Sequence, residues 1–117
     1  PAGSRITLSG NPTNISGRYV WFEGDWDWYW VAKPASASTT ISLRTYGNSA
    51  DYDLYVYKID ASNVIAYAGG SVAADPTESV GPITNDATTT NGFLIGVNGY
   101  AIAADYRTND YVIRIAY

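Results

Sequence analysis

Residues 23–31 read EGDWDWYWV, and residues 51–57 read DYDLYVY. Each stretch begins with acidic side chains two residues apart and continues into large aromatic side chains. Successive side chains of an extended strand point to opposite faces, so the acids of each stretch share one face. The two stretches are therefore predicted to be β-strands whose acids bind a metal ion or protect a strand edge, next to large flat rings.

The composition of the rest of the chain also favours β-structure. Its 117 residues include 11 Gly, 5 Pro, 11 Tyr and 4 Trp, with many Thr, Ser, Val and Ile, which suit strands and turns better than helices. A chain of this length can form one domain with its own core but not two ordinary domains. We expect a single domain over residues 1–117, in which residues 1–14 form an N-terminal strand and linker.

Strand-like runs separated by Gly, Pro and Asn follow one another along the chain. The runs cover residues 5–9, 15–22, 26–33, 39–46, 52–59, 63–68, 78–83, 93–97 and 111–117. The regular alternation of 39–46 and the turn residues after it predict a hairpin with 52–59. Alternation also places the apolar side chains of the last two runs on one face, namely Phe93, Ile95, Val97, Tyr111, Ile113 and Ile115.

These features predict an all-β fold. About eight short strands, without a helical period or a parallel crossover, fit an antiparallel sandwich of two sheets. A jelly roll is the nearest alternative arrangement, so we expect a jelly-roll-like sandwich.

Charge and composition exclude several functions. The net charge of −4 and the lack of any Lys/Arg run argue against nucleic acid or an anionic membrane as partner. Cysteine and histidine are both absent, which removes thiolate nucleophiles, the usual zinc ligands and the commonest general base. No Gly-x-Ser-x-Gly elbow or phosphate loop is present either. We therefore expect no catalytic activity.

The acidic side chains allow two interpretations. Calcium takes six to eight hard oxygens, often from carboxylates that loops at strand ends bring together. Five acids could supply them if both strands start at the same end of the sandwich, namely Glu23, Asp25, Asp27, Asp51 and Asp53. Alternatively, these acids cap turns and protect strand edges, and Asp27 and Asp53 have a structural role.

The order of several motifs resembles the bacterial pre-peptidase C-terminal domain family, which is related to the collagen-binding domains of bacterial collagenases. The resemblance covers about Ile15–Tyr117 and rests on residues 15–17, 24–31, 40–43, 50–57, 69–70, 78–80, 91–100 and 111–115. It implies a jelly-roll-like sandwich next to the catalytic domain of a secreted protease or polysaccharide-degrading enzyme. Some members bind calcium and insoluble substrate, and others assist secretion. The chain departs from the family pattern at Trp30, usually polar, and Tyr52, usually small.

The resemblance also suggests which aromatic side chains face solvent. If Tyr29 and Val31 face the core, alternation directs three rings outward, those of Trp26, Trp28 and Trp30. On the second stretch the outward rings are those of Tyr55 and Tyr57. These five rings are our candidate ligand-binding residues. The alternative is that these rings are packing residues covered by a loop. The strand register decides between the two, because a slip of one residue would exchange the inward and outward faces of the strand.

We therefore expect a non-catalytic accessory domain of a secreted, extracellular bacterial hydrolase, in the first place a protease. It would act as a monomer that targets a tethered catalytic domain to insoluble protein or polysaccharide, with calcium as its candidate ion. One alternative is a carbohydrate-binding module of a polysaccharide-degrading enzyme. The other is a structural or secretion module that binds nothing.

Overall fold

The structure is a computed structural model that describes residues 4–18, 23–45, 50–72, 77–85, 90–101 and 110–117. These residues form nine strands: β1 (Ser4–Ile6), β2 (Thr13–Arg18), β3 (Trp26–Ala32), β4 (Ser38–Thr45), β5 (Asp51–Asp60), β6 (Ile65–Ser71), β7 (Thr77–Thr84), β8 (Thr90–Ala101) and β9 (Tyr111–Ala116). Within the described ranges, no helix is long and apolar enough to cross a membrane.

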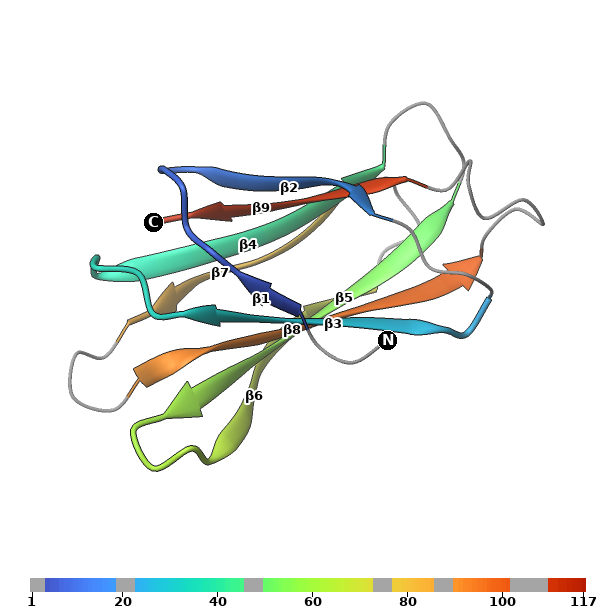
Figure 1. Ribbon diagram of the computed structural model, residues 1–117. Helices are drawn as coiled ribbons and strands as arrows, with labels where there is room; N and C mark the ends of the chain where they lie inside the picture. Colours follow the sequence, from blue (N-terminus) through green and yellow to red (C-terminus); the bar gives the residue numbers. More distant parts are fainter. Residues whose placement is uncertain (1–3, 19–22, 46–49, 73–76, 86–89, 102–109) are drawn as a thin grey trace.

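The strands form two sheets that pack face to face (Figure 1). The five-stranded sheet has the order β1-β3-β8-β5-β6, and the four-stranded sheet has the order β2-β9-β4-β7. The predicted all-β sandwich of two sheets is confirmed, with nine strands where about eight were expected. One pairing differs from the antiparallel expectation, because β1 runs parallel to β3. Between them the chain crosses to the other sheet to form β2, so no tight hairpin forces them to be antiparallel.

The predicted hairpin between residues 39–46 and 52–59 is wrong. Strand β4 pairs with β7 and β9 in the four-stranded sheet, whereas β5 pairs with β6 and β8 in the five-stranded sheet. The chain therefore crosses from one sheet to the other between β4 and β5 (Figure 1). Alternation shows that each strand has one buried face, but two strands that face each other across a core satisfy it as well as two paired neighbours.

The core lies between the inner faces of the sheets. All six side chains that alternation placed on one face are fully buried, so the shared face of each strand is confirmed and it is the inner one. The three from β8 belong to the five-stranded sheet and the three from β9 to the four-stranded sheet, so they face each other across the core. Tyr52, where the resembled family usually has a small residue, is buried here and its ring packs against that of Tyr111 with centroids 4.9 Å apart.

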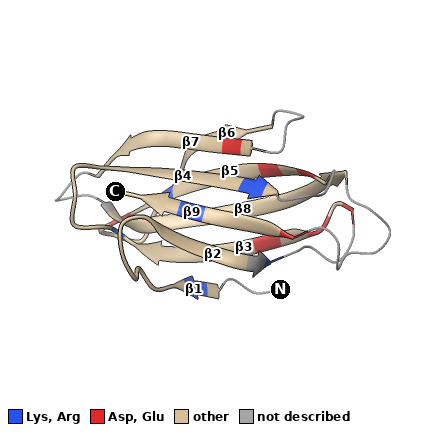
Figure 2. Cartoon of the chain, turned by 90° about the horizontal axis from the view of Figure 1, so that it is seen from above, with Lys and Arg blue, Asp and Glu red and all other residues tan. Residues whose placement is uncertain are grey.

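The outer faces of the two sheets differ in chemistry. On the four-stranded sheet, polar and basic side chains surround a hollow of about 400 Å³, lined by Asn14, Ser42, Arg44, Thr77, Val112 and Arg114. The basic positions on β4 and β9 lie on neighbouring strands (Figure 2). The outer face of the five-stranded sheet instead carries large rings, and one end of the same strands carries acids.

Candidate functional site

The outer face of the five-stranded sheet collects the rings of three strands. Because Tyr29 and Val31 of β3 are buried, the alternate side chains Trp26, Trp28 and Trp30 lie on the opposite face and are partly exposed. On β5, Leu54 and Val56 are buried, while the rings of Tyr55 and Tyr57 lie outward and are partly exposed. The predicted inward and outward sides of both strands are confirmed.

Strand β8 separates the rings of β3 from those of β5 and provides the floor between them. Gly96 lies opposite Trp28 on one side and opposite Tyr55 on the other. A Cβ atom at Gly96 would lie only 2.6 Å from Cζ3 of Trp28, so the indole lies directly over this glycine. The absence of a side chain at Gly96 therefore lets the rings of β3 reach across β8.

The rings form one continuous surface, which we call the aromatic face: Trp26, Trp28, Tyr55, Tyr57 and Tyr67. Trp26 and Trp28 stack with centroids 5.2 Å apart and planes 8° from parallel. Trp26 contacts Tyr55 at 5.2 Å, and Trp28 contacts Tyr57 at 6.1 Å. Tyr57 meets Tyr67 of β6 edge-on at 5.6 Å. Aromatic pairs at these separations stabilise one another, so the face is held in place by its own contacts.

At the edges of this face, two residues differ from the sequence prediction. Tyr67, which was not among the candidates, is 62% exposed and extends the face onto β6. Its only sequence signal is a tyrosine in a weakly predicted strand. The indole of Trp30 is covered instead by the guanidinium of Arg5 from β1, at 4.8 Å from the ring centroid. Such a cation–π contact stabilises the ring without a ligand.

Gly96 provides a direct structural test of the aromatic face. The variant Gly96→Ala should displace the Trp28 indole, because the added methyl group would overlap the ring. We expect a cost of about 1–2 kcal/mol in the free energy of unfolding and altered tryptophan fluorescence and near-UV circular dichroism. Gly10→Ala is the matched control, since nothing lies within 4 Å of its Cβ position. Equal spectra for both variants would contradict the described packing.

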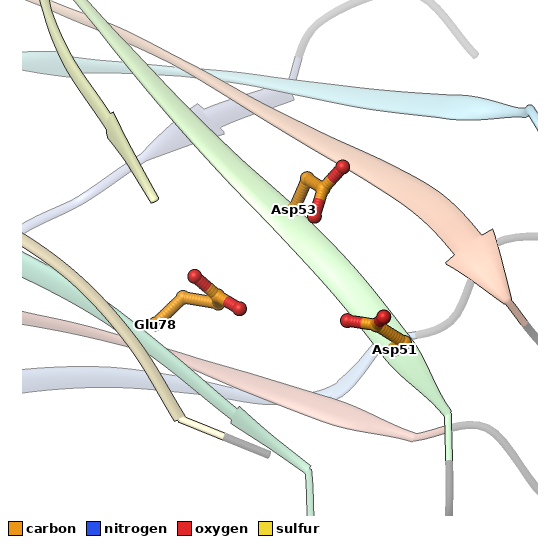
Figure 3. A group of neighbouring side chains, drawn as sticks. All are labelled: Asp51, Asp53 and Glu78. Atoms are coloured by element: carbon orange, nitrogen blue, oxygen red, sulfur yellow. The ribbon is translucent and has the colours of Figure 1, made fainter. Parts of the chain in front are cut away.

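A second group of side chains, which we call the acidic cluster, consists of Asp51, Asp53 and Glu78. One carboxylate oxygen from each lies within 4.8 Å of the others, with Asp51 and Asp53 on β5 and Glu78 on β7 (Figure 3). Glu78 is fully buried, Asp53 is 7% exposed and Asp51 is partly buried. The Ser71 hydroxyl donates a hydrogen bond to Oε2 of Glu78. Three carboxylates this close together can hold a metal ion.

The surroundings of the cluster disfavour its ionised, negatively charged form. Burial raises the pKa of Asp53, and the neighbouring charge of Asp51 raises it further. Both effects favour the protonated form, so the ionised cluster requires a positive charge for compensation.

The structure does not bring the three acids of the first stretch into this cluster. Glu23 is exposed and Asp25 is partly buried at the turn before β3. The two strands do start at the same end of the sheet, because Asn98 of β8 lies between Trp26 and Asp53. However, β8 separates them, and Asp27 points into the core while Asp53 lies on the other face.

Sequence reasoning missed Glu78, the third member of the cluster. It lies at the start of a predicted strand, two residues before the buried Val80 and therefore on the same inward face. An acid at an inward position next to the core was the available signal. Its proximity to Asp51 and Asp53 depends on β7 and β5, which belong to different sheets.

Asp27 takes part in a buried hydrogen-bond chain. Its Oδ2 accepts a hydrogen bond of 2.6 Å from the Tyr111 hydroxyl, which is 2.5 Å from the hydroxyl of Tyr29. Burial raises the pKa of Asp27, although the hydrogen bond from Tyr111 opposes the shift. Burial also raises the pKa of Tyr111. The chain links β3 of one sheet to β9 of the other.

Known proteins share the fold of this chain at low sequence identity. No protein-family model and no curated protein sequence matches this chain. Solved structures with the same architecture include the pre-peptidase C-terminal domain of a collagenase from Bacillus anthracis, with a TM-score of 0.56 and 17% identity over 97% of this chain and 92% of that one. PliG of Aeromonas hydrophila, a periplasmic inhibitor of g-type lysozyme, has a TM-score of 0.54 and 16% identity over 97% and 94% of the two chains.

A third similar structure is CorA of Methylomicrobium album, a surface-associated copper-binding protein. It has a TM-score of 0.56 and 10% identity over 98% of this chain and 97% of that one. At such low identity these likenesses show a shared fold. The sequence has no His, Cys or Met, so it lacks the imidazole and sulfur ligands that copper prefers.

Proposed function

We propose that this chain is a non-catalytic accessory domain of a secreted bacterial hydrolase, in the first place a protease, that binds insoluble substrate through its aromatic face. The observation that carries the proposal is the continuous set of rings over β3, β5 and β6, ending in the largely exposed Tyr67. Neighbouring rings that remain accessible to water favour a ligand that covers them.

The shape of the aromatic face suits a polymer rather than a small molecule. Its rings are spread over three strands of one sheet face. A polymer chain lying on it could contact several rings, each contributing a modest free energy. Such a contact would raise the local concentration of a tethered catalytic domain at the substrate.

The structural likeness to a collagenase pre-peptidase domain supports this proposal, because it extends over nearly the whole of both chains. Within the proposal, the domain works outside the cell as a monomer joined to a catalytic domain. Calcium is the ion proposed to stabilise the domain, because the carboxylates of the domain supply the hard oxygens that calcium prefers.

Retention on insoluble material tests the proposal. The purified chain is incubated with insoluble collagen, cellulose and chitin, and the bound fraction is measured after sedimentation. We expect retention on collagen, with the affinity lowered about tenfold or more by Trp28→Ala and by Tyr57→Ala. Tyr100→Ala is the matched control, because Tyr100 is 66% exposed and is not part of the aromatic face.

The outcomes separate the candidate functions. Retention on polysaccharide alone would replace the protease assignment by a carbohydrate-binding module, which the stacking of flat rings on sugars also permits. If no material retains the folded chain, or if the ring variants bind as well as the parent, a structural or secretion role is favoured instead.

A further inference from the structure

We infer that Asp51, Asp53 and Glu78 form a calcium site that links the two sheets. This site lies outside the aromatic face, and the inference is independent of what that face binds. The three ligand oxygens lie within 4.8 Å of one another, which is about twice the calcium–oxygen distance of roughly 2.3–2.6 Å. One ion can therefore contact a carboxylate from each of the three residues.

Buried carboxylate oxygens that lack hydrogen-bond partners also indicate a bound cation. Asp53 is more than nine-tenths buried and contributes a carboxylate oxygen to the cluster (Figure 3). Its carboxylate has no hydrogen-bond partner among the described residues, and Oδ1 of Asp51 is buried without a hydrogen-bond partner as well. Buried polar groups are normally hydrogen-bonded, and buried charges are paired or bind metal ions. A bound cation would satisfy both carboxylates.

The donor atoms indicate the class of ion. All are carboxylate oxygens, which hard cations such as calcium and magnesium prefer. Magnesium requires a near-regular octahedron at roughly 2.0–2.1 Å, whereas calcium accepts irregular sites with more ligands. Asp51 is only partly buried, so water can complete the coordination from its side. We therefore assign the site to calcium.

The position of the site gives the ion a structural task. Asp51 and Asp53 belong to the five-stranded sheet, and Glu78 belongs to β7, an edge strand of the four-stranded sheet. The Ser71 hydroxyl that binds Glu78 comes from β6, the facing edge strand of the other sheet. An ion here would hold the two edges together on the side of the sandwich where β6 and β7 meet.

Thermal unfolding with and without calcium tests the inference. At a calcium concentration about 100 times the dissociation constant, we expect the melting temperature to be roughly 10 °C higher than in chelator. Glu78→Gln should abolish most of this shift, although its amide oxygen can still accept the Ser71 hydrogen bond. Asp53→Asn should do the same. Glu23→Gln is the control, because this exposed acid lies outside the cluster and its variant should keep the full shift.

Calorimetric titration with calcium chloride provides a second readout, with one site expected per chain. Equal melting temperatures in chelator and calcium would overturn the inference, as would a full shift in both Glu78→Gln and Asp53→Asn. A shift with magnesium as large as that with calcium would overturn the assignment of the ion. Trp28→Ala should keep the calcium shift, so a failure of the aromatic face to bind substrate and a failure of the metal site can be told apart.

Discussion

Replacing Phe93 by alanine is expected to lower the free energy of unfolding by about 3–5 kcal/mol. Phe93 is 0% exposed and lies on β8, the central strand of the five-stranded sheet. Its ring contributes to the core between the two sheets, together with the inward side chains of the neighbouring strands. Truncation would remove this buried apolar area and leave a cavity. Because β8 is paired with a strand on each side, its backbone can move little to close that cavity.

Urea-induced unfolding followed by circular dichroism measures the loss. A domain of this size has a total stability of about 5–15 kcal/mol, so Phe93→Ala is expected to lose a large fraction of it. Leu94→Ala is the matched control. Leu94 is the next residue along β8 but lies on the outer face between Trp30 and Tyr57, so its loss should cost only about 1 kcal/mol. Equal costs would contradict the register of β8.

The second large effect concerns the buried hydrogen bond between Tyr111 and Asp27. The variant Tyr111→Phe keeps the ring but removes the hydroxyl that donates to the Asp27 carboxylate. A hydrogen bond to a charged group contributes about 1.5–3 kcal/mol, and its loss would leave a buried carboxylate without this donor. In an Asp27→Asn background the same change should cost only about 0.5–1.5 kcal/mol, because the acceptor is then neutral. Additive losses would argue against coupling between the two residues.

The pH dependence of stability follows from the same carboxylate. Burial raises the pKa of Asp27 above its ordinary value of 3.8. A carboxyl group with a raised pKa in the folded state stabilises the fold when protonated, and this contribution is lost as pH rises through the folded-state pKa. Asp27→Asn should therefore be at least as stable as the parent at about pH 7 and should lose this advantage towards about pH 4. Unfolding curves at both pH values measure the difference, and a variant that is less stable at pH 7 would contradict it.

Much of the local structure could be predicted because strand geometry is a local property. The alternation in residues 26–31 and 54–57 indicates which side chains share a face, and the structure places them accordingly. The same alternation did not indicate which strands pair with one another. Strands β4 and β5 satisfy it from different sheets, so the expected hairpin was wrong.

The candidate sites show the same division. The outward rings of Trp26, Trp28, Tyr55 and Tyr57 followed from alternation, but the contact of β6 with β5 was needed to add Tyr67. Covering of Trp30 by Arg5 depends on the parallel pairing of β1 with β3. Neither pairing has a signal in the neighbouring sequence.

The sequence by itself therefore determined the β-class, the approximate positions of the strands and the two sides of β3, β5, β8 and β9. Only the tertiary structure decided that Asp51 and Asp53 meet Glu78 and that Asp27 instead binds Tyr111 in the core. The physical reason is that side-chain alternation is set by the geometry of the extended chain, whereas strand pairing is set by the packing of segments far apart in the sequence. The acids of the two stretches look alike in sequence, and it is the sheet around them that separates a candidate metal ligand from a buried hydrogen-bond acceptor.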